Sequence, residues 1–223
     1  MNSVKKYLLW EAGLVTAVLL LLARVLHSFV QFPFVQTYLS TIVALLFLYG
    51  PVVVLRWRGR NVDFLDREKK HFFVSFLWAA GTILIVFPPY MGVAHLWMKF
   101  VWGFQRFVSA GFPDFWNFMA YQFLLVALPE EFFFRGYFQT TLNRVFGQPW
   151  KILGTPLGWS WILTAVVFAF AHSVISLQWW HFSIFFPALL FGYLRERTGT
   201  ITAPIILHAF SNIFIDWFSR SYF

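Results

Sequence analysis

Seven apolar stretches, each about as long as a membrane-spanning helix, fill most of this 223-residue chain. A helix needs about 20 mostly apolar residues to cross the hydrocarbon core of a bilayer. Because that core holds no water, a spanning segment must pair its own backbone groups, as a helix does. We therefore expect an all-α fold, a polytopic transmembrane helical bundle. The stretches run approximately over residues 7–26, 38–55, 72–90, 116–135, 161–179, 182–195 and 200–219.

The composition is that of a membrane protein. Hydrophobic residues make up 60% of the chain, whereas soluble domains contain about 45–50%. The formal net charge of +8 would suit nucleic-acid binding, but the basic residues lie between the apolar stretches and no nucleic-acid-binding motif accompanies them. The absence of cysteine excludes disulfides, thiolate metal sites and a cysteine nucleophile. We expect an integral protein of the cell membrane that contacts lipid and no nucleic acid.

The distribution of basic residues predicts the orientation in the membrane. Loops rich in Lys and Arg stay in the cytoplasm, which places the N-terminus and loop 56–71 there. Seven alternating spans then put thirteen of the seventeen Lys and Arg residues on the cytoplasmic side and the C-terminus outside. Segment 93–112 is an alternative eighth span, although Lys99, Arg106 and its many aromatic residues favour a helix at the interface.

Three polar clusters interrupt the later stretches: PEEFFFRG, FAFAH and HAFSN. They contain Glu130, Glu131, Arg135, His172, His208 and Asn212. Ionisable groups at bilayer depth cost several kcal/mol each and usually mark a function. We expect these clusters to form one site.

Helical spacing indicates which of these groups share a face. Glu131 and Arg135 are four residues apart, with the acid first, which favours an ion pair. Glu130 then points about 100° away from Glu131. Pro129 predicts a local kink or a freed backbone carbonyl.

The same spacing occurs in the other two clusters, because Phe168 and His172 are four residues apart and so are His208 and Asn212. From the predicted spans, Glu130 lies ~8 Å, His172 ~16 Å and His208 ~12 Å from the cytoplasmic membrane surface. We therefore expect the site in the cytoplasmic half of the bilayer, where a cavity open to the cytoplasm would supply water.

The residue types favour hydrolysis by activated water. A carboxylate beside an imidazole can activate water, and the clusters contain no hydroxyl or thiol nucleophile apart from Ser173 and Ser211. A second His and an Asn can donate hydrogen bonds to a developing oxyanion, worth about 3–4 kcal/mol per donor. The implied reaction is hydrolysis of an amide bond.

The ordered set EExxxR, FxxxH and HxxxN on separate late helices resembles the CPBP family of intramembrane endopeptidases. This family includes type II CAAX prenyl proteases and bacteriocin-processing or immunity proteins. The resemblance implies that Glu130 and His172 activate the attacking water and that His208 and Asn212 form the oxyanion hole. It also implies supporting residues, namely Glu131, Arg135 and Phe168.

The resemblance covers approximately residues 115–215. It divides one integral membrane domain into two parts. Residues 1–114 would form N-terminal transmembrane helices and an interfacial segment, and residues 115–223 the catalytic region. The substrate would be a membrane-associated or lipidated peptide, and the oligomeric state stays open.

Three rival hypotheses remain. In a zinc protease, Glu130, His172 and His208 would be the ligands and water would take the open fourth position. Because the chain has no HExxH helix and Asn212 suits an oxyanion hole, we favour the metal-free mechanism and expect no cofactor. The second rival is a non-catalytic immunity or partner protein. The third, a proton-coupled transporter, is disfavoured because the sequence has no internal repeat.

The remaining ionisable residues within or beside the stretches have simpler interpretations. Glu11 is structural or lines a polar cavity, and Asp216 and Arg220, four residues apart, favour a surface pair. The other histidines lie near predicted membrane boundaries, where a histidine needs no chemical role. They are His27, His71, His95 and His181.

Overall fold

The computed structural model describes residues 2–66 and 68–223, and nearly all its regular structure is helical. This result confirms the all-α class. The elements are α1 (Ser3–Ser28), α2 (Pro33–Trp57), α3 (Lys69–Phe100), α4 (Phe115–Tyr121), η1 (Gln122–Ala127), α5 (Leu128–Glu131), η2 (Phe132–Gln139), α6 (Thr140–Phe146), β1 (Trp150–Ile152), β2 (Thr155–Leu157), α7 (Trp159–Ser176), η3 (Trp179–Ile184), α8 (Phe185–Thr198) and α9 (Thr202–Arg220).

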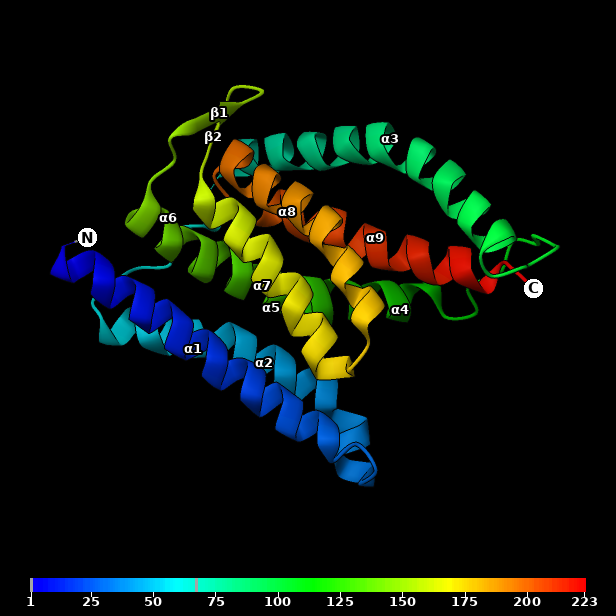
Figure 1. Ribbon diagram of the computed structural model, residues 1–223, viewed down its shortest axis with the longest axis horizontal. Helices are drawn as coiled ribbons and strands as arrows, with labels where there is room; N and C mark the ends of the chain where they lie inside the picture. Colours follow the sequence, from blue (N-terminus) through cyan, green and yellow to red (C-terminus); the bar gives the residue numbers. More distant parts are fainter. Residues whose placement is uncertain (1, 67) are drawn as a thin grey trace.

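The elements from α4 to α6 follow one another without a break and form a single rod, which we call the α4–α6 rod. Helices α1 and α2 pack as an antiparallel pair along one side of the bundle, and α3 bows over α9 on the other side (Figure 1). The short hairpin of β1 and β2, which the all-α expectation did not include, pairs Trp150 with Leu157 and follows α6 (Figure 1).

In the described part of the chain, three helices are long and apolar enough to cross a membrane: α1, α2 and α3. A shorter apolar stretch, Trp159–Ile175, forms most of α7. The later helices carry the polar clusters and pack against one another, so their sequences need not be uniformly apolar. The count of seven spans and the cytoplasmic N-terminus stay predictions.

Segment 93–112 forms neither an eighth span nor an interfacial helix. Helix α3 continues through Phe100, and residues 101–114 are mostly irregular. A short antiparallel bridge between Phe107 and Tyr222 ties this segment to the end of the chain. The aromatic residues that suggested an interfacial helix therefore belong partly to α3 and partly to a loop packed against the C-terminal residues.

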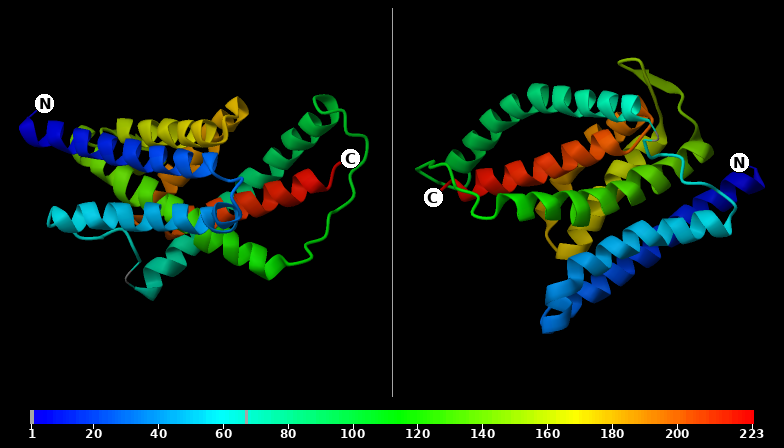
Figure 2. Two further views of the ribbon diagram at one scale, coloured as in Figure 1. Left: turned by 90° about the horizontal axis from the view of Figure 1, so that it is seen from below. Right: turned by 180° about the vertical axis from the view of Figure 1, so that it is seen from behind.

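The connections gather at two ends of the bundle (Figures 1 and 2). The start of α1, the described residues of loop 58–68, the β hairpin and the turn between α8 and α9 lie at one end, which we call the N-terminal end. The turn between α1 and α2, segment 101–114, η3 and the C-terminus lie at the other, the C-terminal end (Figure 1).

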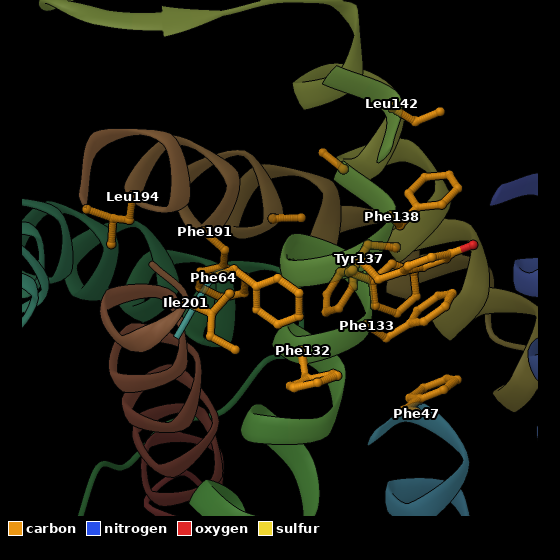
Figure 3. Packing of buried hydrophobic residues seen from close by; sticks show 14 of the residues in the cluster. Phe47, Phe64, Phe132, Phe133, Tyr137, Phe138, Leu142, Phe191, Leu194 and Ile201 are labelled. Atoms are coloured by element: carbon orange, nitrogen blue, oxygen red, sulfur yellow. The ribbon is translucent and has the colours of Figure 1, made fainter. Parts of the chain in front are cut away.

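An aromatic core joins the α4–α6 rod to its neighbours (Figure 3). Phe133 stacks on Phe47 of α2 with ring centroids 5.4 Å apart. Loop 58–68 adds Phe64, which is 1% exposed and meets the Phe132 ring edge to face at 4.9 Å. The amide of Ile201 at the start of α9 donates to the Phe64 carbonyl at 3.0 Å. Phe64 thus closes the N-terminal end of the bundle against the rod.

The close approach of Phe64 requires a glycine at residue 136. A Cβ atom there would lie 2.7 Å from two carbon atoms of the Phe64 ring. We expect Gly136→Ala to lower the stability by about 1–3 kcal/mol, because overpacking forces side chains from their preferred positions. Thermal unfolding of the detergent-solubilised protein measures this loss. The matched control is Gly13→Ala, whose Cβ meets nothing within 4 Å; equal melting temperatures for the two variants would contradict the packing of Phe64.

Candidate active site

The two adjacent glutamates lie where the α4–α6 rod departs from regular α-helix. Two π-helical stretches, η1 and η2, flank the single α-helical turn that contains Pro129, Glu130 and Glu131. Proline lacks the N–H for the bond to the preceding turn and crowds the carbonyl there, so a wider turn relieves the strain. Stretches of π-helix occur frequently at functional sites. The distortion expected at Pro129 thus takes the form of local widening of the helix.

The predicted ion pair between Glu131 and Arg135 is confirmed. The Arg135 Nη1 atom donates to the Glu131 Oε1 atom at 3.1 Å, and both side chains are 0% exposed. Arg135 also donates to the Ala188 carbonyl at 3.2 Å, and its guanidinium lies 4.3 Å from the centre of the Phe168 ring. Arg135 is therefore buried within the rod and links it to α7 and α8.

His208 also contacts the buried ion pair of Glu131 and Arg135. The His208 Nδ1 atom lies 2.8 Å from the same Glu131 Oε1 atom. An ionised carboxylate can only accept hydrogen bonds, so Nδ1 carries the proton. Glu131 therefore fixes the orientation and the tautomer of the imidazole, as a second carboxylate does for a metal-bound or catalytic histidine.

The Glu130 carboxylate faces the Nε2 atoms of the two histidines, His172 and His208. Its Oε2 atom lies 3.6 Å from the His172 Nε2 atom and 3.9 Å from the His208 Nε2 atom. The two adjacent carboxylates therefore approach His208 from opposite edges of its ring, Glu131 at Nδ1 and Glu130 at Nε2. The expectation that Glu130 and Glu131 face different directions is confirmed.

His172, on α7, is oriented by a hydrogen bond within its own helix. Its Nδ1 atom lies 2.9 Å from the Phe168 carbonyl, one turn earlier. A carbonyl only accepts, so His172 donates from Nδ1 and, when neutral, presents a lone pair at Nε2. The Phe168 ring contacts both histidines, with centroids 4.6 Å from His172 and 5.8 Å from His208. Phe168 thus contacts both imidazoles and the Arg135 guanidinium.

Asn212 lies one helical turn after His208 and contacts a residue that the sequence analysis did not single out. Its Nδ2 atom donates to the Gln122 Oε1 atom at 3.0 Å. Gln122 begins η1, eight residues before Glu130. In the sequence, Gln122 could have been noticed as an amide side chain inside an otherwise apolar stretch.

A cavity of about 1030 Å³ opens beside these residues. His172, His208 and Asn212 line its inner part, and the acids lie behind the histidines. The cavity then extends along α9 to Asp216 and Arg220 at the C-terminal end of the bundle. The expected opening of this cavity to the cytoplasm stays a prediction.

Two further expectations concern this cavity. Asp216 and Arg220 form the predicted surface pair, 2.5 Å apart and 38% and 42% exposed. His181, which was assigned no chemistry, lines the cavity.

Glu11 has a structural role at a distance from the cavity. Its carboxylate pairs with Arg60 and lies 3.5 Å from Arg58, and it accepts a hydrogen bond from the Tyr137 hydroxyl at 3.0 Å. Burial of this acid is thus offset by partners from loop 58–68 and from η2. The cluster ties α1 to the rod.

In the described part of the chain, no group of three or more His, Asp or Glu side chains has the arrangement of a metal site. Glu130, His172 and His208 nevertheless converge, with the separations given above. The metal-free and zinc hypotheses therefore both remain to be tested.

Comparison with known proteins gives one match. The model of the family "Type II CAAX prenyl endopeptidase Rce1-like" matches residues 111–214. No curated protein and no solved structure matches the chain. The matched segment contains all three polar clusters and most of the cavity wall. With its apolar helices, the chain is an integral membrane protein, and its residues 111–214 are similar to the Rce1-like family of type II CAAX prenyl endopeptidases.

Proposed function

We propose that the chain is an intramembrane endopeptidase in which Glu130 and His172 activate a water molecule for attack on a peptide bond. The observation that carries this proposal is the 3.6 Å separation between the Glu130 Oε2 and His172 Nε2 atoms beside a membrane cavity. That distance is too long for a direct hydrogen bond. A polar contact of this length commonly includes a bridging water.

The hydrogen bonds around the two side chains support this role. The Glu130 Oε2 atom is buried and accepts no hydrogen bond from the described residues. Neutral His172 presents a second acceptor, because its Nδ1 proton is held by the Phe168 carbonyl. A water between them would donate one hydrogen to each and direct its lone pairs at the substrate carbonyl. Glu130 would accept one proton during attack and transfer it to the leaving amine.

His208 and Asn212 would stabilise the oxyanion. Since Nδ1 of His208 donates to Glu131, its Nε2 atom can donate only when the ring is an imidazolium. Asn212 has two N–H groups, one of which is held by Gln122. The second would donate to the oxyanion.

The substrate would be a membrane-associated peptide. The cavity beside the site is bounded by apolar side chains, among them Phe87 of α3, Leu190 of α8 and Ile215 of α9. Such a cavity suits a lipid chain or an apolar peptide segment. The family name points to prenylated substrates, and the cell membrane is the proposed location.

Glu130→Gln is expected to abolish cleavage and leave a folded protein, because the amide keeps the shape of the side chain but cannot accept the proton. Activity on a verified membrane substrate and thermal unfolding together check this outcome. Unchanged cleavage by the variant would exclude the hydrolase mechanism and favour a non-catalytic partner protein.

Arg135→Ala is the contrasting variant. It leaves Glu131 buried without its cation, a change that costs about 3–5 kcal/mol, so it should lower both melting temperature and activity. Arg144→Ala is the control, since Arg144 and Asp63 form a surface pair at 3.8 Å. Loss of such a pair costs less than about 1 kcal/mol.

Asn212→Ala is expected to reduce kcat about a hundredfold with little change in KM, because the lost hydrogen bond forms mainly in the transition state. Steady-state kinetics with a peptide substrate in detergent measures both constants. Asn117→Ala is the control, because that exposed amide pairs with Asp114 outside the cavity. An equal loss in both variants would remove Asn212 from the oxyanion hole.

A zinc hydrolase is the second candidate, favoured by the convergence of Glu130, His172 and His208. A metal-bound hydroxide would be lost with the metal and restored by its return. We expect activity to survive a strong chelator. Measurement of metal content alongside activity tests this expectation: near-stoichiometric zinc whose removal and return control cleavage would reassign the three residues as ligands.

A further inference from the structure

A second cavity, of about 270 Å³, lies between α1 and α2, and we call it the α1–α2 pocket. It is lined by Tyr7, Trp10, Glu11, Leu14, Val15, Val54, Trp57 and Arg58. The start of α1 and the end of α2, which contribute these residues, lie side by side at the N-terminal end of the bundle (Figure 1). None of these lining residues also lines the cavity beside the active site, so the proposed hydrolysis does not use this pocket.

The pocket has the side chains of a membrane interface. Both helices are long and apolar enough to cross a membrane, and basic residues lie at this end of each. Trp10 and Trp57 line the pocket and are 71% and 77% exposed. Tryptophan and tyrosine gather at the level of the lipid headgroups, where one part of the ring is apolar and another polar. We therefore place the pocket where acyl chains meet headgroups.

Three side chains position the guanidinium of Arg58. It lies 4.7 Å from the centre of the Tyr7 ring and 4.4 Å from the centre of the Trp57 ring, and its Nε atom lies 3.5 Å from a carboxylate oxygen of Glu11. Its Nη atoms donate no hydrogen bond to another described residue, and 37% of the side chain is exposed. A planar guanidinium held by stacking suits a phosphate, whose oxygens can accept from two of its N–H groups.

The charges at the pocket leave one positive charge in excess. Among the described lining residues, Glu11 is the one acid, and its side chain is only 5% exposed. It pairs with Arg60, whose side chain is 15% exposed, as well as with the more exposed Arg58. One carboxylate thus faces two guanidinium groups. The excess charge favours a ligand with a single negative charge.

We propose that the α1–α2 pocket binds an anionic glycerophospholipid. The phosphodiester accepts hydrogen bonds from the Nη atoms of Arg58, and one acyl chain lies against Leu14, Val15 and Val54. Because Leu14 and Val15 follow Glu11 by about one helical turn, the apolar part of the pocket continues from the charged part along α1. The pocket is smaller than the roughly 300–1,000 Å³ of sites for drug-sized ligands. It therefore holds the phosphate and the start of one chain, and the rest of the lipid stays in the bilayer.

This lipid stabilises the attachment of α1 to the α4–α6 rod. Glu11 links the two through its hydrogen bond with the Tyr137 hydroxyl, and Arg58 joins the lipid to Glu11. A ligand that binds only the folded protein raises its stability by mass action. Added phosphatidylglycerol should therefore raise the melting temperature of the delipidated protein in detergent. A melting temperature that does not respond contradicts the proposal.

Native mass spectrometry of the delipidated protein, titrated with phosphatidylglycerol or phosphatidylcholine, tests the choice of lipid. Both lipids have acyl chains and a phosphodiester, but only phosphatidylglycerol has a net negative charge. We expect one phosphatidylglycerol per chain to bind about fivefold more tightly than phosphatidylcholine, because a partly exposed charge pair gives a modest gain. Equal affinities overturn the proposal, since ordinary contact with surrounding lipid does not distinguish these headgroups.

Arg58→Gln removes the charge and keeps a planar polar group. It should weaken phosphatidylglycerol binding about tenfold and abolish the preference over phosphatidylcholine, because a hydrogen bond to a charged group is lost. The control Arg144→Gln removes an exposed arginine outside the pocket and should leave both affinities unchanged. A preference that survives in Arg58→Gln overturns the proposal.

The apolar part of the pocket has its own matched pair of variants. Leu14 and Leu21 of α1 are 65% and 63% exposed, but only Leu14 lines the pocket. Leu14→Gln should weaken phosphatidylglycerol binding several-fold, whereas Leu21→Gln should not. Because both side chains are exposed, this comparison stands even if Arg58→Gln does not fold. Equal binding by the two variants contradicts a seat for the acyl chain in the pocket.

Inorganic phosphate and glycerol phosphate separate a lipid site from a site for free anions. Neither should displace phosphatidylglycerol when added in excess, because neither has an acyl chain to fill the groove. Displacement by either one overturns the lipid as the occupant. None of these measurements requires hydrolysis, so the lipid site and the proposed function stand or fall separately.

Discussion

Burial of the Glu131 carboxylate is the constraint on which the site depends. An isolated carboxylate inside a membrane protein would be too costly to keep ionised. Here the charge is balanced by Arg135 and hydrogen-bonded by His208, and both contacts use the same oxygen. Arg135 in turn binds the Ala188 carbonyl and lies against Phe168. One buried charge thereby fixes the relative positions of the rod, α7, α8 and α9.

The π-helical stretches explain how adjacent acids serve different purposes. Glu131 points into the protein and is fully buried, whereas Glu130 points toward the Nε2 atoms of His208 and His172. A uniform α-helix with Pro129 in its interior would leave an unsatisfied carbonyl and a clash. The wider turns on either side accommodate the proline and keep the rod continuous through the site. Structural support and proposed chemistry can thus come from one short segment.

The sequence predicts the local features of this site better than its surroundings. The pairs of residues four apart follow from helix geometry, so Glu131 with Arg135 and Asp216 with Arg220 could be predicted and are confirmed. Contacts between segments far apart in the chain leave no such periodic signal. For this reason the contact between Gln122 and Asn212, the insertion of Phe64 and the direction of the cavity became visible only in the structure. Segment 93–112 was misread because aromatic richness occurs in interfacial helices and in packed loops alike.

Helix α3 forms one wall of the cavity, and most of its surface is not covered by the rest of the protein. It is 32 residues long, about 48 Å when straight, and only 11% of its most apolar window is buried inside the protein. Two interior prolines, Pro88 and Pro89, lie beside the lining residues Phe87 and Tyr90. A helix longer than the hydrocarbon core must tilt or bend to match it. Because Phe87 and Tyr90 line the cavity, any change in the bend of α3 at Pro88 and Pro89 would change the width of the cavity.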